Sequence, residues 1–236
     1  MLPRFLFRAF GRWSGGGYDP RLNSADGVVP HGFLCGKKPT SIYDIPGLGR
    51  MVTAHLENSF NVKSDFSSWA ADYQIATRYG SESTHVAILD TTLLEDHVKI
   101  YHVPEFVPAG DSRGKYDHEY LAYGPIHGPA FHVVARKDMK RAGLYELCPP
   151  GGRGLNPKRP LASDMDKLVG IAKRVAALFR PASDPRPDIT IALTVSFAAL
   201  IYVDWQGHPD LDQSFLQNAR VYLAEELKHY GKTVAS

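Results

Sequence analysis

The stretch Tyr116-Asp117-His118-Glu119-Tyr120-Leu121-Ala122-Tyr123-Gly124-Pro125-Ile126 places two acids, two residues apart, at the front of an apolar and aromatic run. Such a run predicts a β-strand, in which successive side chains face opposite sides of the sheet. Asp117 and Glu119 are therefore predicted to share one face. Gly124-Pro125 ends the strand before the chain turns back. Neighbouring carboxylates repel each other, so the pair predicts a stabilising arginine and hydroxyl groups elsewhere in the chain. On its own, an acid pair before a turn is more typical of a solvated strand end than of a functional site.

The residues around this stretch predict a first domain of short strands with two helices. Alternating apolar residues predict strands at residues 5–10, 85–90, 98–103 and 130–135, and a strand end at 65–69. Helical spacing predicts helices at residues 45–60 and 70–79, the second ended by Gly80. Residues 11–36 are rich in Gly, Pro, Asn, Asp and Ser, which is typical of a long loop that is mobile or covers a ligand.

The composition changes after residue 147. Residues 148–160 are dominated by Pro and Gly and predict a linker between a first domain of residues 1–147 and a helical extension of residues 161–236. Helices are predicted at residues 164–179, 189–203 and 211–230. The middle helix is apolar almost all round but too short to span a bilayer, so it is predicted to form the buried centre of a small bundle packed on the first domain.

The overall composition is that of an ordinary globular protein. The 236 residues are 44% hydrophobic and 22% charged, and the net charge of +2 predicts no strong attraction to nucleic acid or to a membrane. Cys35 and Cys148 are too few for a disulfide framework and predict reduced thiols. Arginines interrupt the only apolar run at the N-terminus, so if Met1 is the native start a cytoplasmic location is expected. If the native chain begins further upstream, secretion as an effector stays open.

Three segments occur in an order that resembles a known family. Arg8-Ala9 lies on the first predicted strand, Phe66-Ser67-Ser68-Trp69 forms a hydroxyl-bearing strand end, and Asp117-His118-Glu119 precedes the Gly124-Pro125 turn. This order resembles the Arg-Ser-Glu class of mono-ADP-ribosyltransferases, the family of the cholera toxin and heat-labile enterotoxin catalytic chains. His55, upstream of the serine motif, matches an active-site histidine of the toxins. The whole pattern is still more similar to an uncharacterised fungal domain family.

The resemblance implies an α+β fold with split, mainly antiparallel β-sheets and flanking helices, with NAD as a substrate in the cleft between two small sheets. It covers about the first 140 residues; in the toxins it does not extend to the C-terminal helical subdomain.

The implied chemistry is cleavage of the bond between nicotinamide and ribose in NAD. This cleavage develops positive charge on the ribose, which a carboxylate stabilises. Glu119 is expected to act through the ribose 2′-hydroxyl, and Ser67 is expected to hydrogen-bond Glu119. Arg8 is expected to contact the NAD phosphates or brace the site. Trp69, or a loop tyrosine such as Tyr18, is expected to stack on nicotinamide. The implied NAD-binding set is Arg8, Ala9, His55, Ser67, Ser68 and Trp69.

Two positions depart from the toxins and leave the acceptor open. Asp117 is one methylene shorter than the Glu or Gln that engages the acceptor in the family, and Trp69 replaces the third hydroxyl residue. The acceptor of ADP-ribose is therefore a protein, a nucleobase, a small molecule or water, and the last case makes the protein an NAD glycohydrolase. The sequence leaves open whether the chain is a toxin, a conflict-system effector or a housekeeping enzyme, and whether it is a monomer.

The sequence also bears on a metal site and on an inactive, ADP-ribosyltransferase-like module. The histidine pairs His97/His102 and His127/His132 are five residues apart, which places them on opposite faces of a strand, so no metal site is predicted. The stronger alternative is a catalytically inactive ADP-ribosyltransferase-like module that serves as an interaction surface. In that case the helical extension would be the working surface, and Asp117 and Glu119 would be remnants. Considered singly, Ser67 is also typical of a helix N-cap and His55 of a hydrogen-bonded helix histidine.

Overall fold

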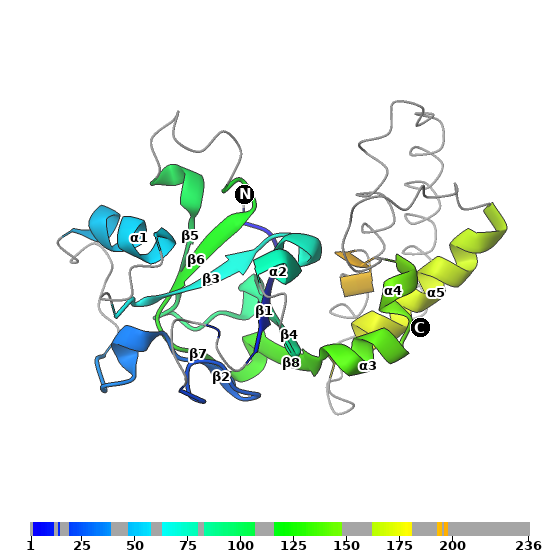
Figure 1. The fold of residues 1–236 in the computed structure, drawn as a ribbon, viewed down its shortest axis with the longest axis horizontal. Helices are drawn as coiled ribbons and strands as arrows, with labels where there is room; N and C mark the ends of the chain where they lie inside the picture. The colour runs from blue at the N-terminus through cyan, green and yellow to red at the C-terminus, as the bar shows by residue number, and fades with distance from the viewer. Residues whose placement is uncertain are drawn as a thin grey trace. The chain divides into compact units, whose positions relative to one another are not determined.

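The structure is a computed structural model that describes residues 2–11, 14, 19–38, 47–57, 63–79, 83–106, 116–147, 162–180, 193–194 and 196–197. The chain divides into two compact units, Met1–Arg136 and Lys137–Ser236. The first unit contains both sheets and helices α1 and α2 (Figure 1). The first predicted domain extended to residue 147, whereas helices α3 and α4 in that stretch group with the second unit, except for Arg136.

The first unit has an α+β fold built on an antiparallel six-stranded sheet with the order β5-β6-β3-β1-β4-β8 (Figure 1). A second, two-stranded sheet pairs β2 with β7. The strands are β1 (Phe5–Phe10), β2 (Gly27–Val28), β3 (Phe66–Ala70), β4 (His85–Asp90), β5 (Lys99–His102), β6 (Glu119–Tyr123), β7 (Ile126–His127) and β8 (Phe131–Ala135). Gly124 has a φ of 94°, which allows the turn after β6 that the Gly-Pro pair predicted.

Strand β1 pairs over a longer stretch with β4 than with β3. With β4 it is in register over six residues, from Phe5 opposite Asp90 to Phe10 opposite His85. With β3 it is in register only where Phe7 lies opposite Ala70, although both strands are fully described. By contrast, β3 pairs with β6 along all five of its residues. The ladder between β1 and β3 therefore ends early, and their backbone groups need other partners there.

Hydrophobic side chains pack on both faces of the sheet. On one face, Phe66, Leu121 and Tyr123 pack with Val52 of helix α1 (Leu48–Leu56), and this face is called the α1 face below. On the opposite face, residues such as Trp69 and Ala122 form a second cluster. Helix α1 falls within the predicted helix of residues 45–60, and the α1 face is where polar residues also gather, as described below.

Two element boundaries differ from the prediction for local reasons. Helix α2 (Tyr73–Tyr79) begins three residues later than predicted, because the Asp72 carboxylate accepts hydrogen bonds from the backbone N–H groups of Gln74 and Ile75 and so caps the helix. Strand β6 begins at Glu119, because the Glu119 N–H donates to the Tyr116 carbonyl and closes a turn at residues 116–118. Asp117 therefore precedes the strand.

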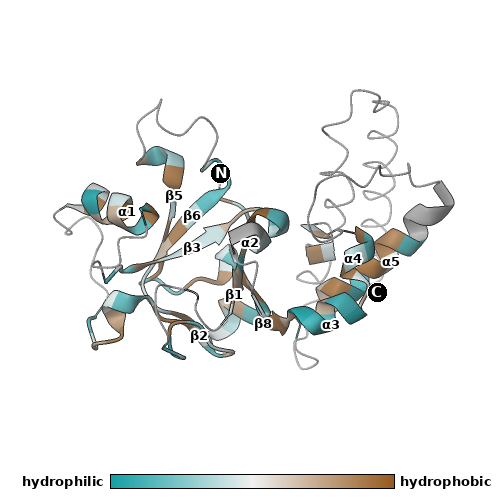
Figure 2. Cartoon of the chain, viewed as in Figure 1, coloured by the Kyte–Doolittle hydropathy of each residue, from teal (hydrophilic) through white to brown (hydrophobic). Residues whose placement is uncertain are grey.

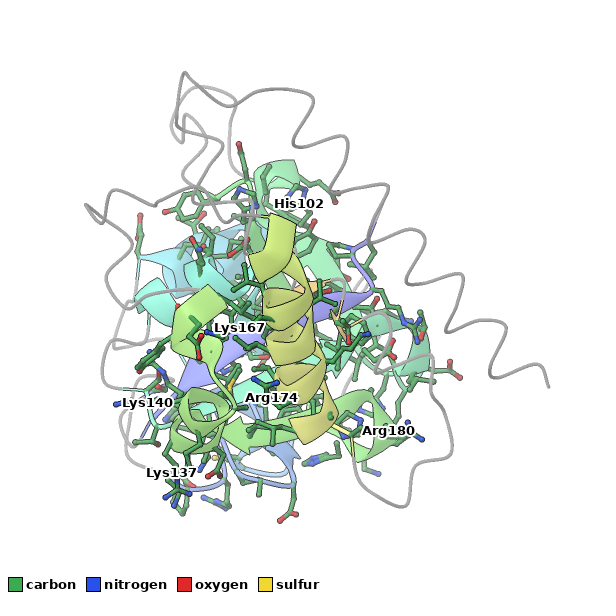
Figure 3. The ribbon with its side chains drawn as sticks, turned by 90° about the vertical axis from the view of Figure 1, so that its right-hand side faces the viewer. His102, Lys137, Lys140, Lys167, Arg174 and Arg180 are labelled. Carbon is green, nitrogen blue, oxygen red and sulfur yellow. The ribbon has the colours of Figure 1, made fainter. Side chains whose placement is uncertain are left out.

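The described part of the second unit is helical. It contains α3 (Arg136–Arg141), whose first residue belongs to the first unit, then α4 (Leu144–Leu147) and α5 (Ala162–Leu178), and α5 agrees with the helix predicted at 164–179. Figure 2 shows α3 as mainly hydrophilic, and Figure 3 labels cations on α3 and at α5. Phe179 stacks on Phe197, with ring centroids 5.8 Å apart.

The predicted linker and the helix predicted at 211–230 lie outside the described residues, as does most of the helix predicted at 189–203. Within the described ranges, no helix has both the length and the hydrophobicity needed to cross a membrane.

Candidate functional site

Arg8 lies where the pairing of β1 with β3 ends. Its Nη1 donates to the Ser68 carbonyl at 2.7 Å, and its Nε donates to the Asn23 side-chain oxygen at 2.8 Å. The guanidinium thereby supplies a donor to a β3 carbonyl at the point where the ladder has ended. Burial lowers the pKa of Arg8 to about 10, so the side chain stays cationic at neutral pH. Among the described residues, no carboxylate pairs with Arg8 and its Nη2 has no hydrogen-bond partner.

His55 joins helix α1 to β3 and to the segment just before it, through two serine hydroxyls. Its Nδ1 lies 2.7 Å from Ser64 Oγ, and its Nε2 lies 2.8 Å from Ser68 Oγ. The edge of the ring packs against Phe66, with centroids 6.2 Å apart. Burial and, to a smaller extent, the positive charge of Arg8 lower the pKa of His55 to about 4. The imidazole is therefore neutral at physiological pH.

Ser68 and Glu119 lie on the same face of the sheet. Ser68 is opposite Leu121, and Glu119 is opposite Ala70, so alternation places both side chains on the α1 face. They are diagonal neighbours there, and the Glu119 side chain is only 8% exposed. Ser68, which is partly exposed, is thus the serine whose hydroxyl shares a face with the predicted catalytic carboxylate.

The structure corrects the prediction for Ser67. Ser67 is opposite Ala122, so its side chain points to the face away from Glu119 and cannot form the expected hydrogen bond. Its Oγ instead accepts a hydrogen bond from Trp69 Nε1 at 2.9 Å, inside the core. Ser67 therefore stabilises the packing of the tryptophan.

The expected stacking of Trp69 on nicotinamide is also wrong. Trp69 is 2% exposed, and its ring packs edge-on against Phe131, with centroids 6.4 Å apart. A ligand has no access to this face of the indole unless the core opens. Tyr18, the other residue expected to stack on nicotinamide, lies outside the described residues.

Asp117 does not share a strand face with Glu119, contrary to the prediction. It lies exposed in the turn before β6, where its backbone carbonyl is 2.8 Å from His102 Nε2. The prediction failed because strand alternation was applied to residues that form a turn. Ala9, which follows Arg8 on β1, lies opposite Val86 of β4 and is partly exposed.

The first unit coincides with a known sequence family. The model of the family described as "Domain of unknown function (DUF7587)" matches residues 1–136. The chain belongs to this family. No curated protein and no solved structure matches the chain. The DUF7587 segment contains all of the site residues discussed above, and the boundary at residue 136 is the one at which the compact units divide.

Two site residues of the DUF7587 segment were not predicted. Asn23 lies in the loop before β2 and holds Arg8, and no sequence signal distinguishes it from the other polar residues of that loop. Ser64 holds His55 and precedes β3. It lies four residues before Ser68, but the chain bends at Asp65 before the strand begins, so strand alternation does not predict that the two serines share a face. Among the described residues, no group of three or more His, Cys, Asp or Glu residues is arranged to hold a metal ion.

Proposed function

We propose that the DUF7587 segment of this chain binds NAD and cleaves its nicotinamide–ribose bond, acting as a mono-ADP-ribosyltransferase or an NAD glycohydrolase. The observation that carries the proposal is that Arg8 and His55 both hydrogen-bond Ser68, Arg8 at the backbone carbonyl and His55 at the hydroxyl, with Glu119 on the same face as the Ser68 side chain. The proposal also uses the resemblance to the Arg-Ser-Glu transferases, which have these residue types in this order.

Glu119 is assigned the role of stabilising the charge that develops on the ribose. The carbon–nitrogen bond to nicotinamide breaks with its electron pair leaving on the nicotinamide nitrogen, and the ribose carbon becomes an oxocarbenium-like centre. An acceptor oxygen or nitrogen then bonds to this carbon and releases its proton. A carboxylate that is only 8% exposed suits this role, because electrostatic stabilisation is stronger where water is largely excluded.

Arg8 is assigned to the NAD phosphates and to bracing of the site. Two of its nitrogens are already engaged by Asn23 and Ser68, which favours bracing over bidentate phosphate contact. The remaining Nη2 has no partner among the described residues and is a suitable donor to one phosphate oxygen. A largely buried cation without a described carboxylate partner is stabilised by binding an anion.

Ser68 takes the role that was expected for Ser67, because only Ser68 shares a face with Glu119. Asp117 is assigned to the acceptor side, since it is exposed two residues before Glu119. This assignment leaves the acceptor undefined, with water as one candidate.

The test is release of nicotinamide from NAD by the full chain, followed by mass spectrometry of the products. Glu119→Gln keeps the shape of the side chain and removes its charge, and we expect it to reduce release at least about 100-fold. Glu95→Gln, an exposed glutamate in the loop before β5, is the matched control and should release nicotinamide like the wild type. Melting temperatures of all three proteins would show that the folds are equally stable.

The products distinguish the two activities, because free ADP-ribose indicates water as the acceptor and a mass addition on another molecule indicates transfer. If the wild type releases no nicotinamide even when cell extract is supplied as acceptor, and excess NAD does not raise its melting temperature, the enzyme proposal is wrong. The interaction module would then be the better description.

A further inference from the structure

His55 is held between two serines that differ in their other contacts. Ser64 Oγ lies 2.7 Å from Nδ1 and also accepts a hydrogen bond from the Phe66 N–H at 3.1 Å. Ser68 Oγ lies 2.8 Å from Nε2, and the imidazole is its only hydroxyl contact among the described residues. The direction of the hydrogen bonds along this chain is determined by which ring nitrogen carries the proton.

A neutral imidazole has one N–H donor and one acceptor nitrogen. Each serine hydroxyl has one proton to donate and can accept hydrogen bonds. Ser64 already accepts from Phe66, and His55 Nδ1 is the one described acceptor within reach of its proton. If Ser64 donates to Nδ1, every group at Ser64 is satisfied, and the ring proton must reside on Nε2.

We propose that Ser64 is a positioning residue that holds His55 in the Nε2–H tautomer, so that His55 donates to Ser68 and the Ser68 proton is directed to an acceptor on the α1 face. Among the described residues the Ser68 hydroxyl contacts only the imidazole, so its proton is available to an oxygen of the bound substrate or to the carboxylate of Glu119, its diagonal neighbour on this face. The chain then runs in one direction, from the Phe66 N–H through Ser64, His55 and Ser68. Consecutive hydrogen bonds of this kind polarise and strengthen one another.

The opposite tautomer, with the proton on Nδ1, would exchange the donor and acceptor roles of the two serines. With the proton on Nδ1, Ser64 would accept two hydrogen bonds and its own proton would have no described acceptor, while Ser68 would donate to Nε2. This second arrangement is that of a serine nucleophile beside a histidine base. The lowered pKa of His55 argues against it, because a ring that protonates only near pH 4 is a weak base at neutral pH.

The proton position can be measured in the wild-type protein. Two-bond proton–nitrogen correlation spectra of the 15N-labelled full chain at pH 7 report which ring nitrogen of each histidine is protonated, and the His55 signals are assigned by their loss in His55→Gln. We expect the Nε2–H tautomer for His55. The Nδ1–H tautomer in the wild type would overturn the proposal and would point instead to Ser68 as a nucleophile.

Variants of Ser64 test whether this residue sets the tautomer. Ser64→Thr keeps the hydroxyl and should keep Nε2–H, whereas Ser64→Ala should give a mixture of both tautomers in a chain whose melting temperature shows that it is folded. An unchanged tautomer in folded Ser64→Ala would refute the role of Ser64. The wild-type spectrum and Ser64→Thr keep the proposal testable if Ser64→Ala does not fold.

The catalytic consequence rests on the proposed function, but the tautomer does not. In the nicotinamide-release assay, Ser64→Ala should lower kcat by about 10- to 100-fold with little change in KM, because substrate binding does not use Ser64, and Ser64→Thr should restore kcat. If the wild type cleaves no NAD but its spectrum shows Nε2–H, the proposed function fails and the tautomer assignment stands. If NAD is cleaved and Ser64→Ala is as active as Ser64→Thr, the positioning role of Ser64 is wrong and the proposed function stands.

Discussion

Acidification should destabilise the first unit through His55. The ordinary pKa of a histidine in an unfolded chain is about 6.5, and the pKa of His55 in the folded protein is lowered to about 4 by burial and by Arg8. Between these values the unfolded chain binds more protons than the folded one, so stability is lost as the pH falls from about 6.5 towards 4. The full difference corresponds to about 3 kcal/mol, of which about 2 kcal/mol should appear between pH 7 and pH 4.5.

The measurement is urea unfolding of the full chain at pH 7 and at pH 4.5, followed by tryptophan fluorescence in a Trp205→Phe background. The remaining tryptophans then belong to the first unit. Carboxylates also titrate in this range, so the informative quantity is the difference between variants. His55→Gln does not titrate and should lose about 2 kcal/mol less than its parent between the two pH values. His118→Gln, at an exposed position in the turn before β6, is the control and should behave like the parent.

Equal pH dependence in the parent and in His55→Gln would refute the reasoning. So would an NMR titration in which the His55 ring protonates near pH 6.5, because the burial and the nearby charge of Arg8 would then have no effect on the imidazole.

Three further substitutions test other contacts of the first unit, each by urea unfolding. Trp69→Phe keeps the aromatic packing but removes the hydrogen bond to Ser67. We expect the free energy of unfolding to fall by about 1 kcal/mol and nicotinamide release to be unchanged. A large loss of release would show that Trp69 belongs to the substrate site. Lys37→Met leaves the Asp65 carboxylate, which is 2% exposed, without its cation. The free energy of unfolding should fall by about 1–3 kcal/mol. An unchanged free energy would show that the ion pair is not formed. Arg8→Lys cannot reproduce the forked contacts of the guanidinium and should cost about 1–3 kcal/mol, and a fully stable variant would contradict the bracing role.

Much of the fold could be read from local patterns. The alternation of apolar residues identified the strands that became β1, β4, β5 and β8 to within a residue or so, and helical spacing identified α1 and α5. These predictions succeeded because periods of two and 3.6 residues are properties of the chain itself. The start of α2 was misplaced, since the capping carboxylate of Asp72 lies inside what reads as a continuous helical segment.

The sequence selected most residues of the candidate site but did not predict which of their side chains lie together. Arg8, His55 and the serine motif were all selected from the sequence, and the structure joins Arg8, His55 and Ser68 by hydrogen bonds. The sequence could not decide between Ser67 and Ser68, because alternation says that adjacent residues face opposite sides without saying which side is which. A shift of one residue in register would exchange their roles.

By itself, then, the sequence determined the α+β class and the positions of most strands, and it supplied the residue types of the candidate site. The tertiary structure decided which hydroxyl shares a face with Glu119, that Asp117 lies in a turn, and that Ser64 and Asn23 hold His55 and Arg8. The physical reason is that these outcomes depend on pairing between strands that are distant in the chain. Such pairing is selected by the packing of both sheet faces together, and no local pattern contains that information.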